Sequence, residues 1–191
     1  MTVQSKLSLP SHDLESKDPA IRRVLEGASK KLGFIPNMYA NMVNLPPLLE
    51  TYLYGYDKFR TKSGFNSVEQ EVVLLTISYE NSCHYCVAAH SMLADNVSKV
   101  PGDVTDAIRE RRAIPDPKLA ALSLFTAAMV TRRGWVEQHD TDHFLAAGFE
   151  EKHILAILLA ISVKTISNYS NHLFDTPVDD IFKSREWHGK A

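Results

Sequence analysis

The sequence predicts an all-α fold. No stretch of the chain alternates apolar and polar residues with a period of two, the pattern that a half-buried strand needs. Apolar side chains instead recur at spacings of three and four, as in Leu48, Leu49, Tyr52, Leu53 and Tyr56. Proline or a capping residue precedes most of these segments and glycine follows several of them, as expected for helices that begin and end within the chain.

Capping residues, prolines and glycines in the sequence set the expected bounds of each helix. A capping box, Ser67 with Gln70, is expected to start the fourth helix, and Asn81 or Ser82 to cap the fifth. Residues 97–102 are expected to form a loop, and the last segment reads as one long apolar helix or two helices in line. Helices are expected over residues 18–32, 38–43, 46–63, 67–80, 82–96, 105–111, 118–133, 137–147 and 150–174.

The expected organisation is one all-helical domain. Residues 1–17 read as an N-terminal arm, residues 18–175 as the domain, and residues 176–191 as a C-terminal tail with a weak helical pattern. At 191 residues with 45% hydrophobic residues, the chain has enough apolar side chains for a packed core.

An internal repeat runs through this domain. Shifting residues 69–90 by 82 positions aligns them without a gap on residues 151–172, so the repeat copies span about 63–95 and 147–175. His90 then matches His172, whereas Cys83 matches Thr165 and Cys86 matches Asn168. The sequence therefore predicts two duplicated halves, of which only the N-terminal half carries the cysteine pair.

Composition disfavours several function classes. The chain has 21 Lys and Arg against 23 Asp and Glu, a formal net charge of −2, and no basic block, so nucleic acid and anionic membranes are not expected partners. The first residues lack signal-peptide organisation, and the longest apolar run, residues 154–163, is shorter than a membrane span. A cytoplasmic protein is expected.

Both cysteines lie in one short motif with a histidine. On a helix, Cys83, Cys86 and His90 would share one face, and the start of a helix lowers the pKa of a thiol. In a reducing compartment such a pair reacts or binds metal. A cycle between dithiol and disulfide is favoured over two alternatives. One is that the cysteines are merely small buried side chains. The other is a zinc site, in which His84 would have to be the fourth ligand beside the two cysteines and His90. Haem attachment is excluded because Val87 follows the second cysteine.

Glu71 stands in an otherwise apolar run, where a buried carboxylate is unfavourable unless it has a partner. If the two helices pack antiparallel across the turn at residues 81–82, Glu71 returns towards His90 and forms a carboxylate–histidine–thiol relay. Tyr85 and His84 are expected to line the site. His139 and His143 have the spacing of two metal ligands on a helix, but no third ligand of clear spacing accompanies them. They are therefore interpreted as solvent-exposed residues near the start of a helix.

The spacing Glu71, Cys83, Cys86 and His90 resembles the signature of the AhpD-like alkylhydroperoxidases, in the carboxymuconolactone decarboxylase superfamily. The segments at residues 33–37 and 46–49 are similar to the N-terminal part of its peroxidase-related members, and the resemblance covers most of residues 20–175. Well-known members have histidine directly before the second cysteine, where this chain has Tyr85. A shorter relay is therefore expected.

The resemblance implies an internally duplicated helical bundle that assembles into a homo-oligomer, a trimer or hexamer, without cofactor or metal. It also implies a thiol peroxidase in which Cys86 is peroxidatic, Cys83 resolving, His90 the base and Glu71 the proton relay. Its partners would be a hydroperoxide and a dithiol reductant of the lipoyl or thioredoxin-like kind. The alternatives are a thiol–disulfide oxidoreductase or redox sensor, and a non-catalytic metal-binding or oligomeric module.

Overall fold

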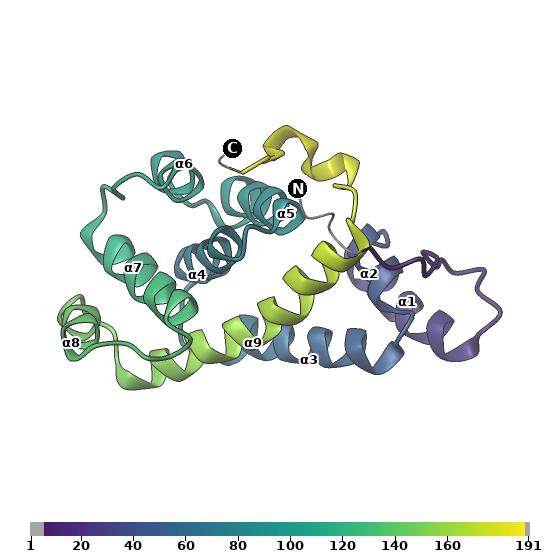
Figure 1. Ribbon diagram of the computed structural model, residues 1–191, viewed down its shortest axis with the longest axis horizontal. Helices are drawn as coiled ribbons and strands as arrows, with labels where there is room; N and C mark the ends of the chain where they lie inside the picture. The colour runs from purple at the N-terminus through teal and green to yellow at the C-terminus, as the bar shows by residue number, and fades with distance from the viewer. Residues whose placement is uncertain (1–5, 190–191) are drawn as a thin grey trace.

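The computed structural model describes residues 6–189, and every regular element in that range is helical (Figure 1). The predicted all-α fold is confirmed. The elements are α1 (Pro19–Leu32), α2 (Asn37–Met42), α3 (Pro46–Lys62), α4 (Ser67–Glu80), α5 (His84–Leu93), the π-helix η1 (Ala94–Ser98), α6 (Gly102–Glu110), α7 (Pro117–Thr131), α8 (Gln138–Ala146), α9 (Glu151–Phe174) and the 3-10 helix η2 (Asp180–Arg185).

The capping box that starts α4 differs from the predicted one. The Asn66 side chain accepts a hydrogen bond from the Glu69 N–H at 2.9 Å, and the Glu69 carboxylate accepts one from the Asn66 N–H at 3.0 Å. The predicted box of Ser67 and Gln70 is wrong because asparagine one position earlier caps the helix, which makes Ser67 its first residue. The Gln70 amide instead donates to the carbonyl of Phe65 at 2.9 Å.

The loop predicted over residues 97–102 is shorter in the structure, where only residues 99–101 lie outside a helix. The chain continues from α5 into η1, whose wider turn ends at Lys99 in the left-handed conformation, with φ of 57°. The Val100 N–H then donates to the Ala94 carbonyl at 2.9 Å, and Val100 is buried. Helix α6 consequently begins at Gly102 rather than near residue 105.

The two repeat copies are alike where they begin. Gly64 and Gly148 both have positive φ, 84° and 91°, and each is followed by a phenylalanine and a capping box. The rings of Phe65 and Phe149 pack edge to face with centroids 5.8 Å apart. Further along, the first copy turns between α4 and α5, whereas α9 continues unbroken for 24 residues. The copies therefore diverge at the position of the cysteine pair.

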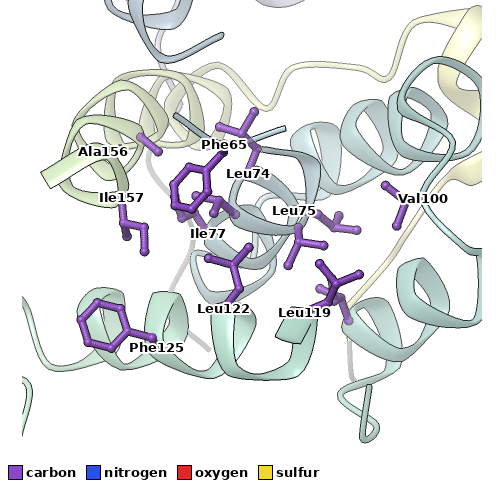
Figure 2. Close-up of a cluster of buried hydrophobic side chains, with 14 of the residues drawn as sticks. Phe65, Leu74, Leu75, Ile77, Val100, Leu119, Leu122, Phe125, Ala156 and Ile157 are labelled. Atoms are coloured by element: carbon purple, nitrogen blue, oxygen red, sulfur yellow. The ribbon is translucent and has the colours of Figure 1, made fainter. Parts of the chain in front are cut away.

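Helix α4 is the centre of the larger hydrophobic cluster. Figure 2 shows its side chains Leu74, Leu75 and Ile77 beside Leu122 of α7 and Ile157 of α9. All five are fully or almost fully buried, and burying a leucine or isoleucine contributes roughly 1.5–3 kcal/mol. A second cluster joins α1, α2 and α3 to α5 and contains both cysteines. Helix α4 thus holds α5 against the rest of the bundle.

Helix α9 is long and apolar enough to cross a membrane by length and composition alone. Half of its apolar window is buried inside the protein, and that buried side includes polar residues, among them Lys164, Asn168 and Asn171. This is the pattern of a core helix in a globular bundle, as its place along the length of the molecule in Figure 1 also indicates.

The first and last described segments, near residues 7 and 176–189, pack against the bundle. In the arm, the Leu7 N–H donates to the Leu173 carbonyl at the end of α9 at 2.8 Å. At the other end, η2 lies against α5 (yellow in Figure 1), Phe182 is buried, and the Trp187 ring lies 5.5 Å from Tyr79. Residues 176–189 therefore form one side of the region around the cysteines.

Candidate active site

The turn between α4 and α5 brings the predicted carboxylate and histidine together. Ser82 adopts a positive φ of 54°, which reverses the chain over a few residues. Glu71 on α4 thereby returns beside His90 on α5, and Oε2 of Glu71 lies 2.9 Å from Nδ1 of His90. Both side chains are buried, so this contact is sheltered from water.

The cysteines lie at the start of α5, and the helix begins at His84, at least one residue later than predicted. Cys83 is itself the N-cap, with extended backbone angles φ −88° and ψ 98°, and Cys86 is the third helical residue. The predicted cap at Asn81 or Ser82 is wrong because the tight turn occupies those residues. Only Cys86 and His90, four residues apart, share a helical face. Both thiols are free and buried.

Cys86 lies where a thiolate is favoured. Burial raises the pKa of its thiol, but a hydrogen bond from Cys83, the charge of Lys164 and the interaction of the thiolate with His90 bring that pKa well below its ordinary value. The Asn171 amide N–H₂ donates to Cys86 Sγ at 3.3 Å. Burial, together with Cys86, raises the pKa of Cys83 well above its ordinary value. The two thiols are thus unequal: their surroundings favour the thiolate of Cys86 and the protonated thiol of Cys83.

Lys164 on α9 is a site residue that the sequence reasoning missed. Its side chain is 0% exposed, and its Nζ has no hydrogen-bond partner within the described part of the chain. Its ammonium group lies close enough to Cys86 to lower the pKa of that thiol. The sequence held a signal, since Lys164 follows Ile157 and Ala160 at helical spacing on the apolar face of residues 150–174. A lysine on such a face is rarely buried without a role.

Arg60 on α3 is the second site residue that sequence reasoning missed. Its guanidinium pairs with Oε1 of Glu71 and donates to the Tyr56 hydroxyl at 2.6 Å. Burial acts to raise the pKa of Glu71, but His90 and Arg60 together hold it below its ordinary value. Nothing in the sequence distinguishes Arg60 from the neighbouring Lys58 and Lys62, because the pairing depends on how α3 packs against α4.

His90 is held as a neutral imidazole. Its burial and the charge of Lys164 lower its pKa, against the opposing effect of Glu71. With the Glu71 carboxylate accepting from Nδ1–H, the other ring nitrogen, Nε2, is left as the basic atom. Around it lie the Glu71 carboxylate and two cations, Lys164 and Arg60, so transfer of the Cys86 proton to His90 places the new thiolate among positive charges.

A cavity of about 530 Å³ opens onto Cys86, His90, Glu71 and Lys164. Its other walls are mostly apolar and aromatic, as is usual for small-molecule sites. The aromatic wall consists of Phe34, Tyr39, Tyr52, Tyr56, Tyr85 and Phe182.

The two residues expected to line the site are placed differently. Tyr85 lines the cavity, is buried, and its hydroxyl donates to the Asp179 carboxylate beside η2. Its ring lies 6.0 Å from Phe182, so the C-terminal segment is fixed to the cavity wall. His84 is exposed, packs edge to face against Trp187 at 5.4 Å, and does not line the 530 Å³ cavity.

The histidines of α8 lie outside this site. His139 is exposed, and its Nδ1 lies 3.3 Å from the Glu137 carboxylate at the start of the helix. Within residues 6–189, no group of three or more His, Cys, Asp or Glu side chains is arranged to hold a metal ion.

Comparison with known proteins gives structural likeness only. No protein-family model and no curated protein sequence matches the chain. A solved structure described as an alkylhydroperoxidase AhpD core, an uncharacterised peroxidase-related protein from Ralstonia eutropha JMP134, matches with TM-score 0.81 and 21% identity over 100% of both chains. A peroxidase-related protein from Silicibacter sp. TM1040 matches with TM-score 0.75 and 20% identity over 94% of this chain and 97% of its own. A cysteine-to-alanine variant of the debrominase Bmp8, in complex with 2,3,4-tribromopyrrole, matches with TM-score 0.75 and 17% identity over 95% and 97%.

Proposed function

We propose that this chain, which has the AhpD-like fold, is a thiol-dependent peroxidase that reduces an organic hydroperoxide with the Cys83–Cys86 pair. The observation that carries the proposal is the setting of Cys86. Its thiol has a lowered pKa and lines a 530 Å³ cavity together with a neutral, carboxylate-bound histidine. A thiolate beside a substrate-sized cavity is the nucleophile that peroxide chemistry requires.

The first step forms the sulfenic acid. His90 accepts the Cys86 proton at Nε2, and Glu71 stabilises the imidazolium through Nδ1–H. The thiolate attacks the hydroperoxide, the O–O bond breaks, and Cys86 becomes a sulfenic acid while the alkoxide takes the proton from His90 and leaves as the alcohol. Lys164 stabilises the thiolate before the attack.

The second step forms the disulfide. The Cys83 sulfur attacks the sulfenic sulfur, an S–S bond forms, and hydroxide leaves with the Cys83 proton as water. An external dithiol then reduces the disulfide by exchange and restores both thiols. The net reaction converts one hydroperoxide and one dithiol into alcohol, water and one disulfide.

Turnover with an organic hydroperoxide tests this function. Cumene hydroperoxide and dithiothreitol are mixed with the wild-type protein, and the alcohol product is quantified by chromatography. Alcohol should form far faster than with dithiothreitol alone, and Cys86→Ser should reduce the rate to that background. If wild type and Cys86→Ser form alcohol at the same rate, the proposal is wrong.

The cavity also favours a second candidate, reductive dehalogenation of an aromatic compound. Its wall of aromatic rings suits a flat apolar ring, and a structural neighbour is a debrominase. The same two thiols would supply two electrons, replace a carbon–halogen bond with carbon–hydrogen, and release hydrogen halide as the disulfide forms. Halide release from 2,3,4-tribromopyrrole under the same conditions distinguishes the two reactions.

A further inference from the structure

The two cysteines line different cavities. Cys86 lines the 530 Å³ cavity and Cys83 does not. Cys83 instead lines a second cavity of about 130 Å³, whose other walls include His84, Asn171 and Thr176. Among the described residues, only Tyr85 lines both cavities.

The second cavity, which we call the Cys83 cavity, differs in character from the first. Ser82, His84 and Asp175 lie at its edge and are exposed, whereas Cys83 and Asn171 are buried within it. Its walls are mainly polar, in contrast to the apolar wall around Cys86. It is therefore a small surface cavity that leads to a buried sulfur.

We propose that a small dithiol reductant reaches the disulfide through the Cys83 cavity and attacks Cys83, while the oxidising substrate reaches Cys86 through the larger cavity. This inference rests on the proposed dithiol–disulfide cycle and assigns the reducing half of that cycle its own binding site. Substrate and reductant then need not replace each other in one pocket.

The exchange step is balanced in this direction. A thiolate of the reductant attacks Cys83 Sγ, the Cys83–Cys86 bond breaks, and its electron pair leaves on Cys86. The second thiol of the reductant then attacks the mixed disulfide and releases Cys83, which takes up a proton as the reductant closes to its own disulfide. Lys164 and His90 stabilise Cys86 as the departing thiolate, and a thiol of lower pKa leaves faster.

The size of the cavity selects the class of reductant. The Cys83 cavity, at about 130 Å³, has about a quarter of the volume of the 530 Å³ cavity, and Cys83 is 0% exposed. A slender alkyl dithiol, free or carried on a flexible arm, fits this space, whereas the surface dithiol of a folded redox protein cannot reach the sulfur without displacing the walls.

Two polar groups are available to such a reductant. Oδ1 of Asn171 is buried and has no hydrogen-bond partner within residues 6–189, so it can accept a hydrogen bond from an incoming S–H or N–H. His84 stands at the edge, and burial together with His188 and His172 lowers its pKa. Its neutral imidazole can take the proton of the attacking thiol.

Separate measurement of the two half-reactions tests the inference. The disulfide form is prepared with diamide, so that it does not depend on any hydroperoxide, and its reduction by dithiothreitol is followed by thiol counting. Oxidation of the reduced protein by cumene hydroperoxide is followed in the same way. His84→Trp narrows the Cys83 cavity, Val97→Trp narrows the larger cavity, and Ser184→Trp, an exposed serine on η2 outside both cavities, is the matched control.

We expect His84→Trp to slow reduction at least tenfold relative to Ser184→Trp, and Val97→Trp to slow oxidation instead. Circular dichroism checks that His84→Trp folds. If it does not, Ser82→Phe is the second variant that narrows the Cys83 cavity. The inference is wrong if Val97→Trp slows reduction while His84→Trp and Ser82→Phe leave the rate of reduction unchanged. The reductant would then use the larger cavity.

A comparison of reductants tests the size argument. Dithiothreitol should reduce the disulfide faster than a thioredoxin-type protein at equal dithiol concentration. If a dithiol arm on a carrier protein also reduces the disulfide faster than the thioredoxin-type protein, a carrier-borne dithiol is a reductant of this chain. Faster reduction by the thioredoxin-type protein would overturn the proposed class. If the diamide-made disulfide behaves as expected but no hydroperoxide oxidises the reduced protein, this inference stands and the proposed peroxidase function fails.

Discussion

Nδ1 of His90 lies 2.9 Å from Oε2 of Glu71, and both side chains are buried beneath the cavity that Cys86 lines. This contact fixes which nitrogen of His90 carries the proton and which remains basic. It also joins α4 to α5 through a carboxylate that the second repeat copy lacks, because His153 occupies the position equivalent to Glu71. The relay is therefore a property of the first half alone.

Replacing Glu71 by glutamine should slow oxidation of the reduced protein by about 10²-fold, because His90 loses the carboxylate that stabilises its protonated form. Glu69→Gln is the matched control: Glu69 is also buried on α4, but it caps the helix and pairs with Lys118 at 2.8 Å, and glutamine preserves the cap. Rapid-quench thiol counting gives both rates, and equal rates for the two variants would contradict the relay.

The same variant makes a prediction about stability and pH. Glu71 has a lowered pKa, so its ionised form stabilises the fold above the ordinary carboxyl pKa of about 4.3, and this contribution is lost as pH falls through the folded value. Glu71→Gln should therefore be destabilised near neutral pH by on the order of 2 kcal/mol. The difference from wild type in urea unfolding should shrink in acid; a constant difference would show that Glu71 is not ionised in the fold.

Replacing Lys164 by methionine should raise the pKa of Cys86, because the buried positive charge that favours its thiolate is removed. The ultraviolet thiolate absorbance should then appear at higher pH than in wild type, and oxidation at neutral pH should slow by on the order of tenfold. Lys152→Met, an exposed lysine on the same helix, should leave the titration unchanged. A coincident titration for Lys164→Met and wild type would exclude Lys164 as the stabilising charge.

Replacing Phe144 by alanine should destabilise the protein by about 3–5 kcal/mol, since the fully buried ring stacks between Phe125 at 4.5 Å and Phe149 at 4.6 Å. Trp135→Ala removes a larger side chain that is 85% exposed and should cost less than about 0.5 kcal/mol. Chemical unfolding of both variants tests this. A similar loss for both would mean that the stack of Phe125, Phe144 and Phe149 is not part of the core.

Much of the fold could be predicted because local signals determine it. Asp18 with Pro19 caps α1 in the structure as the sequence indicates, and Gly33 ends that helix in the left-handed conformation. The exceptions arise where two local signals compete. Asn66 and Ser67 are comparable capping residues, and the structure uses Asn66, which pairs with Glu69. The turn at residues 81–82 leaves Cys83 as the cap of α5.

The site could be predicted only where its residues lie close in sequence or in one hairpin. Cys86, His90 and Glu71 belong to α4 and α5, so their spacing carried the signal. Arg60 and Lys164 come from α3 and α9, and only the packing of those helices places their charges in the site. The separation of the cysteines into two cavities likewise depends on Asn171 and Thr176, which no local pattern relates to Cys83.

The most direct test of the central claim is a single turnover. Fully reduced protein is mixed with one equivalent of cumene hydroperoxide, and intact mass and free thiols are followed over seconds. The account predicts that wild type loses two hydrogens and both thiols, that Cys83→Ser gains one oxygen as a trapped sulfenic acid, and that Cys86→Ser is unchanged. Oxidation of wild type no faster than that of free cysteine, or rapid sulfenic acid formation in Cys86→Ser, would contradict it.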